Sequence, residues 1–513
     1  MLLCATLLFL LTSESQVGLF DEGLILTGAF RVLAGELPSR DFLANYGPGQ
    51  FMALAAAFKL FGANMLVARI YDAVICALVV GVTYAWLARS QPRWLATCCA
   101  VCVSGLLIEF RIAGSPVQPC LLLSLAAAFR LSDASFAGAH REALWPVSLA
   151  LGLLLVFRYD ITPLAAGSLA LALLAVEKSR VAAGEIKPRP AYRRFAQDAF
   201  ALGAGPLLAA AILGATGILG AALADLGAYY TMSKYIAIRS LPWPGLADFA
   251  VMPLDSAAVY TPAVAVAVGF STIWRARRRG LTLHSDSGLV TIVVFTLLTA
   301  AFFTKGFVRT SGTHMLLANV PACVLVFLCL TRSFAGERSR RTAIRLTALF
   351  AGWILLRNGY SAAPLYRVVL GGQTHPDLPA LSCFRLEEDR IRAAATIVQL
   401  TDPQDRILSA TGRHDKVYAV DMAIYFITRR LPATRWHHYD PGVQTTPEVQ
   451  REIIQDLERE HVRLVMVDLA YDQVQEPNQS ALSSGVRELD RYLRAAFQPA
   501  AHFGTILVCV RHP

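Results

Sequence analysis

The chain has 513 residues, of which 55% are hydrophobic and 16% are charged, and its mean hydropathy is +0.48. This apolar share exceeds the roughly 45–50% of soluble domains, so the composition predicts an integral membrane protein and excludes a soluble enzyme, a nucleic-acid-binding protein or a disordered scaffold. The net charge of +10 does not indicate nucleic acid, because most clustered arginines lie in short joints between apolar segments.

Apolar segments fill most of the chain before about residue 357. A helix needs about 20 mostly apolar residues to cross a hydrocarbon core of about 30 Å. Hydropathy predicts about eleven such helices, near residues 1–19, 65–88, 94–109, 117–131, 144–157, 161–176, 199–223, 258–274, 288–304, 315–331 and 343–357. The first is short, contains Glu14 and has no basic residue before it. A signal peptide is the alternative, but no small-residue cleavage site is clear, so we expect an uncleaved helix.

The joints between these helices alternate in charge. Basic residues gather after every second helix, at Arg89, Arg93, Arg130, Arg141, Lys178, Arg180, Lys187, Arg189, Arg193, Arg194, Arg275, Arg277, Arg278, Arg279, Arg332, Arg338, Arg340 and Arg341. By the positive-inside rule these joints face the cytoplasm. We therefore expect residues 13–64, 224–257 and everything after about 358 on the outer side.

The first outer loop opens with two adjacent carboxylates, Asp21 and Glu22. Apolar residues recur after them at helical spacing as far as Ala34, which predicts an amphipathic helix lying in the membrane interface. A second interfacial helix, FMALAAAFKLFG, follows the turn signal YGPG. The two carboxylates alone are also explained as favourable charges at a helix N-terminus, an effect of about 0.3–1 kcal/mol.

Further ionisable residues lie near the outer ends of other helices. Arg158 and Asp160 flank Tyr159 after the fifth helix, and they form either a pair at the interface or part of a substrate cavity. Lys305, Arg309 and His314 precede the tenth helix. Lys and Arg at this depth can hold a phosphate, Arg with the better bidentate geometry, although extension toward the interface explains Lys305 equally well.

The composition changes after about residue 372. Helical periodicity and short β-rich runs alternate there, so the last 140 or so residues predict a small soluble α/β domain. Within it, RWHHYD contains His437, His438 and Asp440, but adjacent histidines on a strand point to opposite faces, which argues against a metal site. Cys383 and Cys509 fall in the first and last elements of this domain and are either bonded or buried thiols, whereas the other cysteines lie in predicted helices.

The spacing of the first loop resembles a known family. The acidic pair is followed by G-x-x-P-x-R-D-F, with Arg40 and Asp41, and then by YGPG beginning at Tyr46. This pattern, together with the paired interfacial helices, resembles the GT-C fold of bacterial membrane glycosyltransferases of family 39 or the ArnT-like type. The resemblance covers about residues 1–357 and implies that Asp21, with Glu22 beside it, is the catalytic carboxylate. It also implies a sugar donor carried on a polyprenyl phosphate. YGPGQ stands where the aminoarabinose and protein-mannosyl branches have a basic or His-containing element, so their donor-phosphate contacts cannot be transferred.

We therefore expect a polytopic α-helical membrane protein with a transmembrane GT-C-like domain over residues 1–357 and an extracytoplasmic α/β domain over 358–513. The resemblance implies an inverting glycosyltransferase of the bacterial inner membrane that uses a glycan, lipid or protein of the envelope as acceptor. In such a reaction Asp21 is the general base, and the leaving phosphate needs a cation. We assign binding of donor phosphate or substrate to Arg40, Asp41, Tyr46, Arg158, Asp160, Lys305, Arg309 and His314. No cofactor is required by the sequence, and a divalent metal is an alternative to the cations.

Two other classes of membrane protein remain as alternative functions. A secondary transporter or lipid flippase with an outer ligand-binding domain is the main alternative, but the matching broken helices of two inverted halves are not evident in the sequence. A membrane-anchored sensor would not need so many helices.

Overall fold

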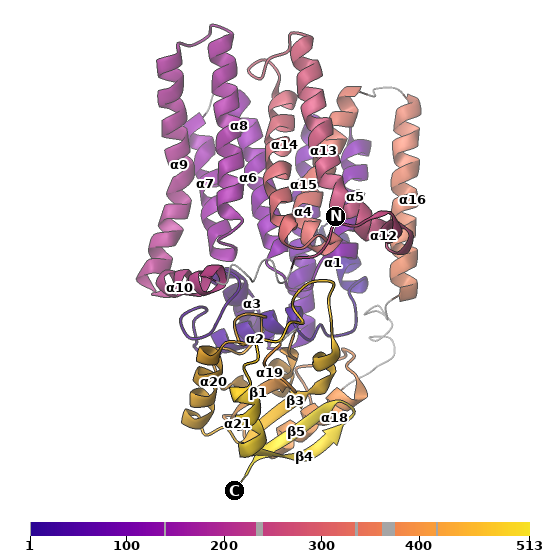
Figure 1. The fold of residues 1–513 in the computed structure, drawn as a ribbon. Helices are drawn as coiled ribbons and strands as arrows, with labels where there is room; N and C mark the ends of the chain where they lie inside the picture. The colour runs from indigo at the N-terminus through magenta and orange to yellow at the C-terminus, as the bar shows by residue number, and fades with distance from the viewer. Residues whose placement is uncertain are drawn as a thin grey trace.

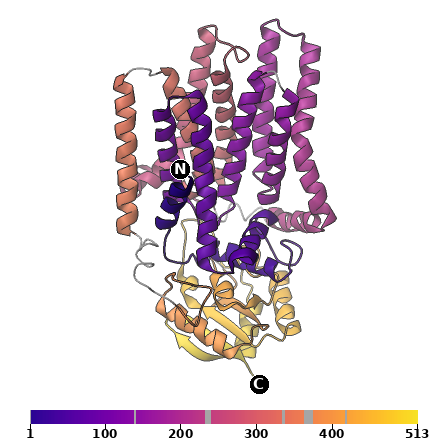
Figure 2. The same ribbon diagram turned by 180° about the vertical axis from the view of Figure 1, so that it is seen from behind.

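The computed structural model describes residues 2–137, 140–231, 240–333, 337–361, 375–416 and 419–512. A bundle of long helices carries a compact α/β domain at one end, and two short helices, α2 and α3, lie at the junction (Figure 1). Figure 2 shows the same junction from behind, with the N-terminal part of the chain between the bundle and the α/β domain.

The long helices of the bundle run roughly parallel to one another. They are α4 (Met65–Ser90), α5 (Arg93–Phe110), α6 (Val117–Ala137), α7 (His140–Phe157), α8 (Thr162–Ala182), α9 (Pro188–Ala215), α13 (Pro253–Arg278), α14 (Ser287–Lys305) with the one-turn η1 (Gly306–Val308), α15 (Gly312–Ser333) and α16 (Glu337–Ser361). In the part of the chain that the structure describes, six are long and apolar enough to span a membrane: α4, α5, α9, α13, α14 with η1, and α15. The protein is thus a multi-pass membrane protein, as the sequence predicts.

Two predicted spans differ from the structure. The first helix, expected over residues 1–19, is only α1 (Leu2–Leu11). It ends early because the chain after it joins the α/β domain, where Val17 donates a backbone hydrogen bond to the carbonyl of Arg385 (3.3 Å). The span expected over 199–223 is broken, because Gly217 adopts a φ of +77° between α9 and the separate helix α10 (Ile218–Thr231). Helix α10 lies across the end of the bundle (Figure 1).

The helices α2 (Asp21–Leu33) and α3 (Pro48–Phe61) begin and end close to the predicted positions. Helix α2 is buried on almost every side from Glu22 to Ala29. Its Thr27 hydroxyl donates to the carbonyl of Met422 (2.7 Å) in the α/β domain. It is therefore enclosed between protein layers, which the periodicity of its own sequence does not reveal.

The α/β domain is built on a mixed five-stranded sheet of order β2-β1-β3-β5-β4. The first three strands in this order are parallel, and β5 and β4 are antiparallel additions. Its elements are α18 (Glu388–Leu400), β1 (Arg406–Thr411), α19 (Ala423–Thr428), β2 (Leu431–Pro432), α20 (Pro447–Arg459), β3 (Leu464–Asp468), η2 (Leu469–Gln473), α21 (Glu488–Ala496), β4 (Phe497–Phe503) and β5 (Ile506–Arg511). Cys383 and Cys509 are both free thiols here, so the alternative of a disulfide between them is not realised.

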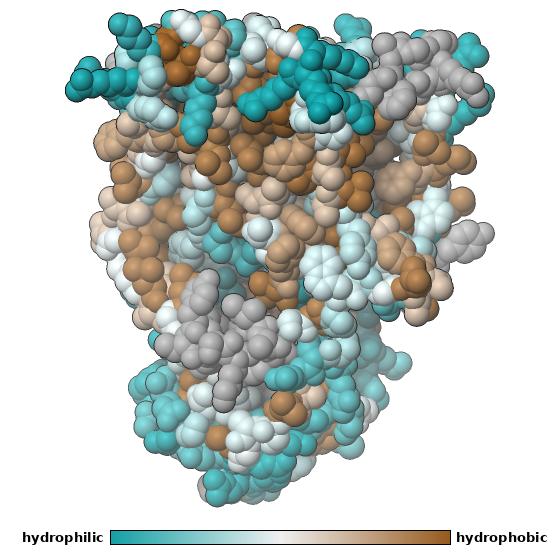
Figure 3. Space-filling view, turned by 45° about the horizontal axis from the view of Figure 1, so that its top comes forward, coloured by the Kyte–Doolittle hydropathy of each residue, from teal (hydrophilic) through white to brown (hydrophobic). Residues whose placement is uncertain are grey.

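Two hydrophobic cores hold the molecule together. One lies within the helical bundle, and the other joins α2, α3 and the start of α4 to the α/β domain. The expected boundary at residue 357 falls inside α16, and residues 362–374 lie outside the described part. The space-filling view shows an apolar band around the bundle, with hydrophilic residues at its far end and over the α/β domain (Figure 3). The basic joint between α8 and α9 is at the far end, opposite the α/β domain (Figure 1).

Candidate functional site

The joint between α7 and α8 carries a carboxylate held by two cations. The guanidinium of Arg158 donates to both oxygens of Asp160, at 3.0 and 2.8 Å. The ammonium of Lys305, at the end of α14, lies 2.5 Å from the same carboxylate. Burial opposes ionisation of Asp160, but the two cations outweigh it and hold the pKa of Asp160 below its usual value. The predicted pair of Arg158 and Asp160 is present, and it includes Lys305 as a third member.

The YGPG turn places Tyr46 over this group. The Gly47 amide donates to the carbonyl of Phe157 at the end of α7 (3.0 Å), and a Cβ at Gly47 would lie 2.3 Å from the carbonyl of Val156. Only glycine allows such a close approach of the two backbones. With the turn docked there, the guanidinium carbon of Arg158 lies 5.0 Å from the centre of the Tyr46 ring, a cation–π contact.

Asp21 lies within electrostatic reach of the same place. It is the exposed first residue of α2. Burial raises the pKa of Tyr46 to about 12, the charge of Asp21 adds to this rise, and the guanidinium of Arg158 opposes it. Asp21, Tyr46, Arg158, Asp160 and Lys305 are called the outer polar cluster below. It combines one exposed carboxylate, a phenol that stays protonated at neutral pH and two cations, which is the chemistry needed to move a proton and to neutralise an anion.

Glu22 has a different environment from its neighbour. Its carboxylate lies 2.9 Å from the guanidinium of Arg69 on α4, and both side chains are nearly inaccessible to solvent. The same carboxylate accepts a hydrogen bond from the Gly18 amide (2.8 Å). Glu22 thus fastens the start of α2 to α4 immediately beside Asp21.

Four other predicted site residues, Arg309, His314, Arg40 and Asp41, make contacts outside the cluster. Arg309 forms a bidentate pair with Glu476 of the α/β domain, with one contact of 3.1 Å. His314 is exposed, and its Nδ1 lies 2.8 Å from the Ser311 hydroxyl. Exposed Arg40 donates to both oxygens of Asp41 at 3.0 and 2.8 Å, within its own loop.

The histidines of RWHHYD are structural supports for the loop that carries Tyr46. Asn45 donates to the Asp440 carboxylate (3.1 Å), and its amide oxygen lies 3.0 Å from Nε2 of His438. Both partners are fully buried. Across the described ranges, no three or more His, Cys, Asp or Glu side chains gather as a metal site. The structure therefore singles out no ligands for the divalent cation that the sequence left as an alternative.

Sequence reasoning missed three residues near the cluster: Arg69, Asp225 and Arg435. Asp225 is buried on α10, and Arg435 binds it at 2.8 Å. The break at Gly217 brings Asp225 to the junction, and this glycine is the feature of the sequence that could have indicated it.

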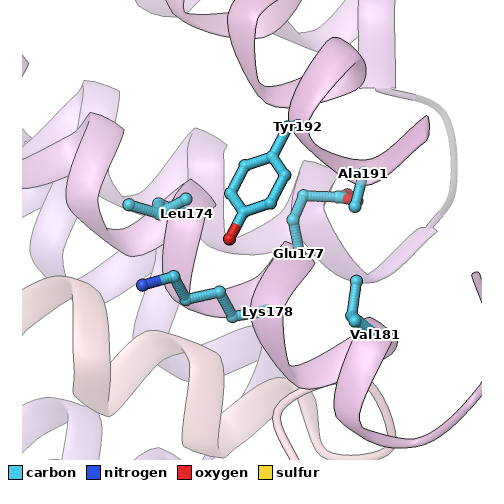
Figure 4. Close-up of a pocket in the computed structure, with 6 residues that line it drawn as sticks. All are labelled: Leu174, Glu177, Lys178, Val181, Ala191 and Tyr192. Atoms are coloured by element: carbon cyan, nitrogen blue, oxygen red, sulfur yellow. The ribbon is translucent and has the colours of Figure 1, made fainter. Parts of the chain in front are cut away.

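A pocket of about 60 Å³ lies between α8 and α9, toward the end of the bundle remote from the α/β domain (Figure 1 and Figure 4). It is lined by Glu177, Lys178 and Tyr192 among others.

Comparison with solved structures decides the fold. The structure resembles ArnT from Cupriavidus metallidurans, both in the apo state and bound to undecaprenyl phosphate, with a TM-score of 0.54, 12% identity and coverage of 99% of this chain and 96% of that chain. The chain has the GT-C fold. The archaeal oligosaccharyltransferase AglB from Archaeoglobus fulgidus, in complex with an inhibitory peptide and a dolichol-phosphate, is similar with a TM-score of 0.51 and 12% identity, covering 91% of this chain and 69% of that one.

No family model and no curated protein sequence matches the chain. At 12% identity the solved structures establish the fold alone, which confirms the predicted helical membrane architecture with a C-terminal α/β domain.

Proposed function

We propose that this GT-C protein is an inverting glycosyltransferase that moves a sugar from a polyprenyl-phosphate donor to an acceptor hydroxyl. The observation that carries the proposal is the outer polar cluster, because it collects Asp21, Tyr46, Arg158, Asp160 and Lys305 from four separate parts of the chain at one junction. The solved neighbours support the donor class, since one is bound to undecaprenyl phosphate and another to dolichol-phosphate.

The reaction forms one bond and breaks one. The acceptor oxygen attacks the anomeric carbon from the side opposite the phosphate, and the bond between that carbon and the phosphate oxygen breaks through an oxocarbenium-like state. Asp21 takes the proton of the acceptor hydroxyl, and polyprenyl phosphate leaves with the bonding electron pair. General-base assistance of this kind contributes roughly 10²–10⁴ in rate.

The leaving phosphate is proposed to bind where Lys305 and Arg158 now hold Asp160. Lys305 is the more accessible cation, with 33% of its side chain exposed against 13% for Arg158. Its ammonium can therefore turn to the phosphate while Arg158 keeps Asp160 in place. Tyr46, protonated because its pKa is about 12, is available as a hydrogen-bond donor to the same anion.

The other proposed roles follow from the contacts. Glu22 positions Asp21 through Arg69 and does not itself react. Arg40, Asp41, Arg309 and His314 stay candidates for binding acceptor or donor headgroup. The proposed reaction has no step that uses a divalent metal.

We propose that the protein lies in the bacterial inner membrane, with the cluster and the α/β domain on the extracytoplasmic side. Its proposed acceptor is a glycan, lipid or protein of the envelope. These contacts favour a transferase over a transporter or flippase.

The test is a transfer assay with the purified full-length protein in lipid vesicles. Labelled polyprenyl-phosphate sugars, a hexose and a pentose in separate reactions, are supplied with an envelope extract as acceptor. Asp21→Asn keeps size and removes the base, so transfer should fall by roughly 10²–10⁴ while the melting temperature stays unchanged. Glu185→Gln is the matched control, because Glu185 is a carboxylate in the joint between α8 and α9, at the end of the bundle opposite the α/β domain, where it contacts Arg180 at 3.3 Å.

Glu22→Gln should have an intermediate effect, with some loss of thermal stability as well as of transfer. If Asp21→Asn retains more than about a third of the wild-type rate, Asp21 is an ordinary helix start. The base would then have to be Asp160 or Asp41.

A further inference from the structure

A second group of polar side chains lies beside the outer polar cluster. It consists of Tyr159 from the joint between α7 and α8, Asp225 from α10 and Arg435 from the α/β domain, and is called the α10 cluster below. Arg435 binds one oxygen of Asp225 at 2.8 Å, and Asp225 is only 6% exposed. Burial, and secondly the charge of Asp225, raise the pKa of Tyr159, so Tyr159 lies within electrostatic reach of Asp225.

The α10 cluster has hydrogen-bonding groups left over. The second oxygen of Asp225, the Tyr159 hydroxyl and Nε of Arg435 are all buried, and none has a hydrogen-bond partner within the described ranges. The Ser39 hydroxyl is also buried and has no hydrogen-bond partner in the described ranges. The carbonyl of Ser39 accepts a hydrogen bond from Arg435 at 3.4 Å. Buried polar groups are normally paired, so these four open groups, on Arg435, its two partners and Tyr159, indicate a ligand or ordered water that pairs them.

The kinds of group present favour a hydroxylated ligand. Asp225 accepts hydrogen bonds, Arg435 donates them, and Tyr159 and Ser39 do both. A sugar hydroxyl needs both a donor and an acceptor. The charges of Asp225 and Arg435 balance each other, so this group has no net positive charge with which to attract a phosphate.

The α10 cluster is also in the right place for such a ligand. Tyr159 stands between Arg158 and Asp160 of the outer polar cluster in the chain. On the other side, the Ala44 amide lowers the pKa of Asp225, and Tyr46 follows two residues later. The two clusters therefore flank the same short segment of the first loop and the same joint.

We propose that Tyr159, Asp225 and Arg435 bind the hydroxyl groups of the donor sugar while its phosphate lies at Lys305 and Arg158, an inference that rests on the proposed function. These three side chains contact the sugar directly but do not react with it. They orient the sugar ring toward Asp21 and select which sugar is accepted.

The experiment compares two kinds of lipid on the full-length protein in nanodiscs. Equilibrium binding is measured for bare polyprenyl phosphate and, separately, for polyprenyl-phosphate glucose, mannose and arabinose. For the wild type, at least one sugar should tighten binding about tenfold over the bare lipid. Tyr159→Phe should reduce this gain about threefold to tenfold, and Asp225→Asn about tenfold or more, because one neutral and one charged hydrogen bond are lost.

Neither variant should change the binding of bare polyprenyl phosphate. Tyr192→Phe, at the remote end of the bundle, is the matched control and should change neither measurement. Tyr159→Phe removes only the phenolic hydroxyl, so it tests sugar binding even if Asp225→Asn folds poorly. The inference is overturned if no sugar tightens binding by the wild type, or if both variants keep the full gain. Failure of the wild type to bind bare polyprenyl phosphate would instead overturn the proposed function.

Discussion

Asp160 is held by two cations of the outer polar cluster, Arg158 and Lys305. Of these two, Lys305 can give up its contact with Asp160 more easily. Arg158 keeps two hydrogen bonds to Asp160 whatever Lys305 does, so loss of Lys305 leaves no carboxylate without a cation. The same reasoning gives the two cations different roles. Arg158 is needed for the geometry of the joint, and Lys305 is the cation that can turn to the donor phosphate that we propose.

Lys305→Met should therefore weaken use of the donor with little effect on folding. Loss of one charged hydrogen bond to a phosphate corresponds to about 1.5–3 kcal/mol, so the donor KM should rise about tenfold to 100-fold. Steady-state kinetics in vesicles measures this, with Lys178→Met at the far end of the bundle as the control. An unchanged KM would mean that Lys305 only neutralises Asp160.

Asp225 provides a prediction about pH. Burial raises its pKa from 3.8 to about 6, against the opposing effect of Arg435. Because the folded protein then binds this proton more tightly than the unfolded chain, the stabilisation is complete below about pH 3.8 and is lost as the pH rises to about 6. The melting temperature of the wild type minus that of Asp225→Asn should fall over this window and stay level above it. A difference that is constant from about pH 4 to 7 would contradict the raised pKa.

The sequence located the acidic pair but assigned both members to catalysis. Asp21 and Glu22 are adjacent in the chain, yet one is exposed and the other is bound to Arg69, 47 positions further along. Nothing in the local pattern tells the two apart, because the difference depends on where α4 packs. The sequence singled out Arg158, Asp160 and Lys305 because ionisable residues near outer helix ends are uncommon, and Tyr46 because it begins the YGPG motif; the structure brings these four side chains together.

At the scale of elements, the outer polar cluster depends on two close backbone contacts. Gly47 lies against the end of α7, and Gly23 of α2 lies against α19, where a Cβ would be 2.4 Å from the amide nitrogen of Ala423. The first contact sets the position of Tyr46 and the second sets that of Asp21. Glycine is thus placed where helices or turns from distant parts of the chain meet.

Gly47→Ala should disrupt the site without straining its own backbone, because Gly47 has an ordinary φ of −61°. The added methyl group would meet the Val156 carbonyl, so we expect a loss of roughly 1–3 kcal/mol in stability and a marked loss of transfer. Thermal melting and the transfer assay measure the two effects. Gly203→Ala on α9, where a Cβ meets nothing within 4 Å, is the control. Wild-type behaviour of Gly47→Ala would show that the turn is not tightly docked.

Most predicted helices were correct because a span of apolar residues has few alternatives in a membrane. The errors fell at α1 and α10, where an apolar segment leaves the bundle to meet the α/β domain. Asp225 was missed for that reason. Its segment read as the end of a spanning helix, and its partner Arg435 lies 210 positions away. Contacts of that range are set by the assembled fold and not by hydropathy.

On the scale of the whole molecule, the second hydrophobic core makes the first loop and the α/β domain one unit. Leu43 of the loop donates a backbone hydrogen bond to the carbonyl of Arg435 (3.0 Å), and Arg31 of α2 donates to the carbonyl of Thr434 (2.9 Å). Asp21 and the α/β domain must therefore be on the same side of the membrane. The basic joint between α8 and α9 is at the other end of the bundle (Figure 1).

This arrangement makes the orientation testable with reporter fusions. The joint between α13 and α14, which contains Arg279, lies at the end of the bundle opposite the α/β domain (Figure 1), so Arg279 and the C-terminus should lie on opposite sides of the membrane. By the positive-inside rule, green fluorescent protein fused after Arg279 should fluoresce in the cytoplasm, and alkaline phosphatase fused after Pro513 should be active outside. Exchanging the two reporters gives the control, since both should then be silent. A fluorescent C-terminal fusion would place Asp21 on the cytoplasmic side as well, because α2 and the α/β domain share one core, and extracytoplasmic transfer would have to be abandoned.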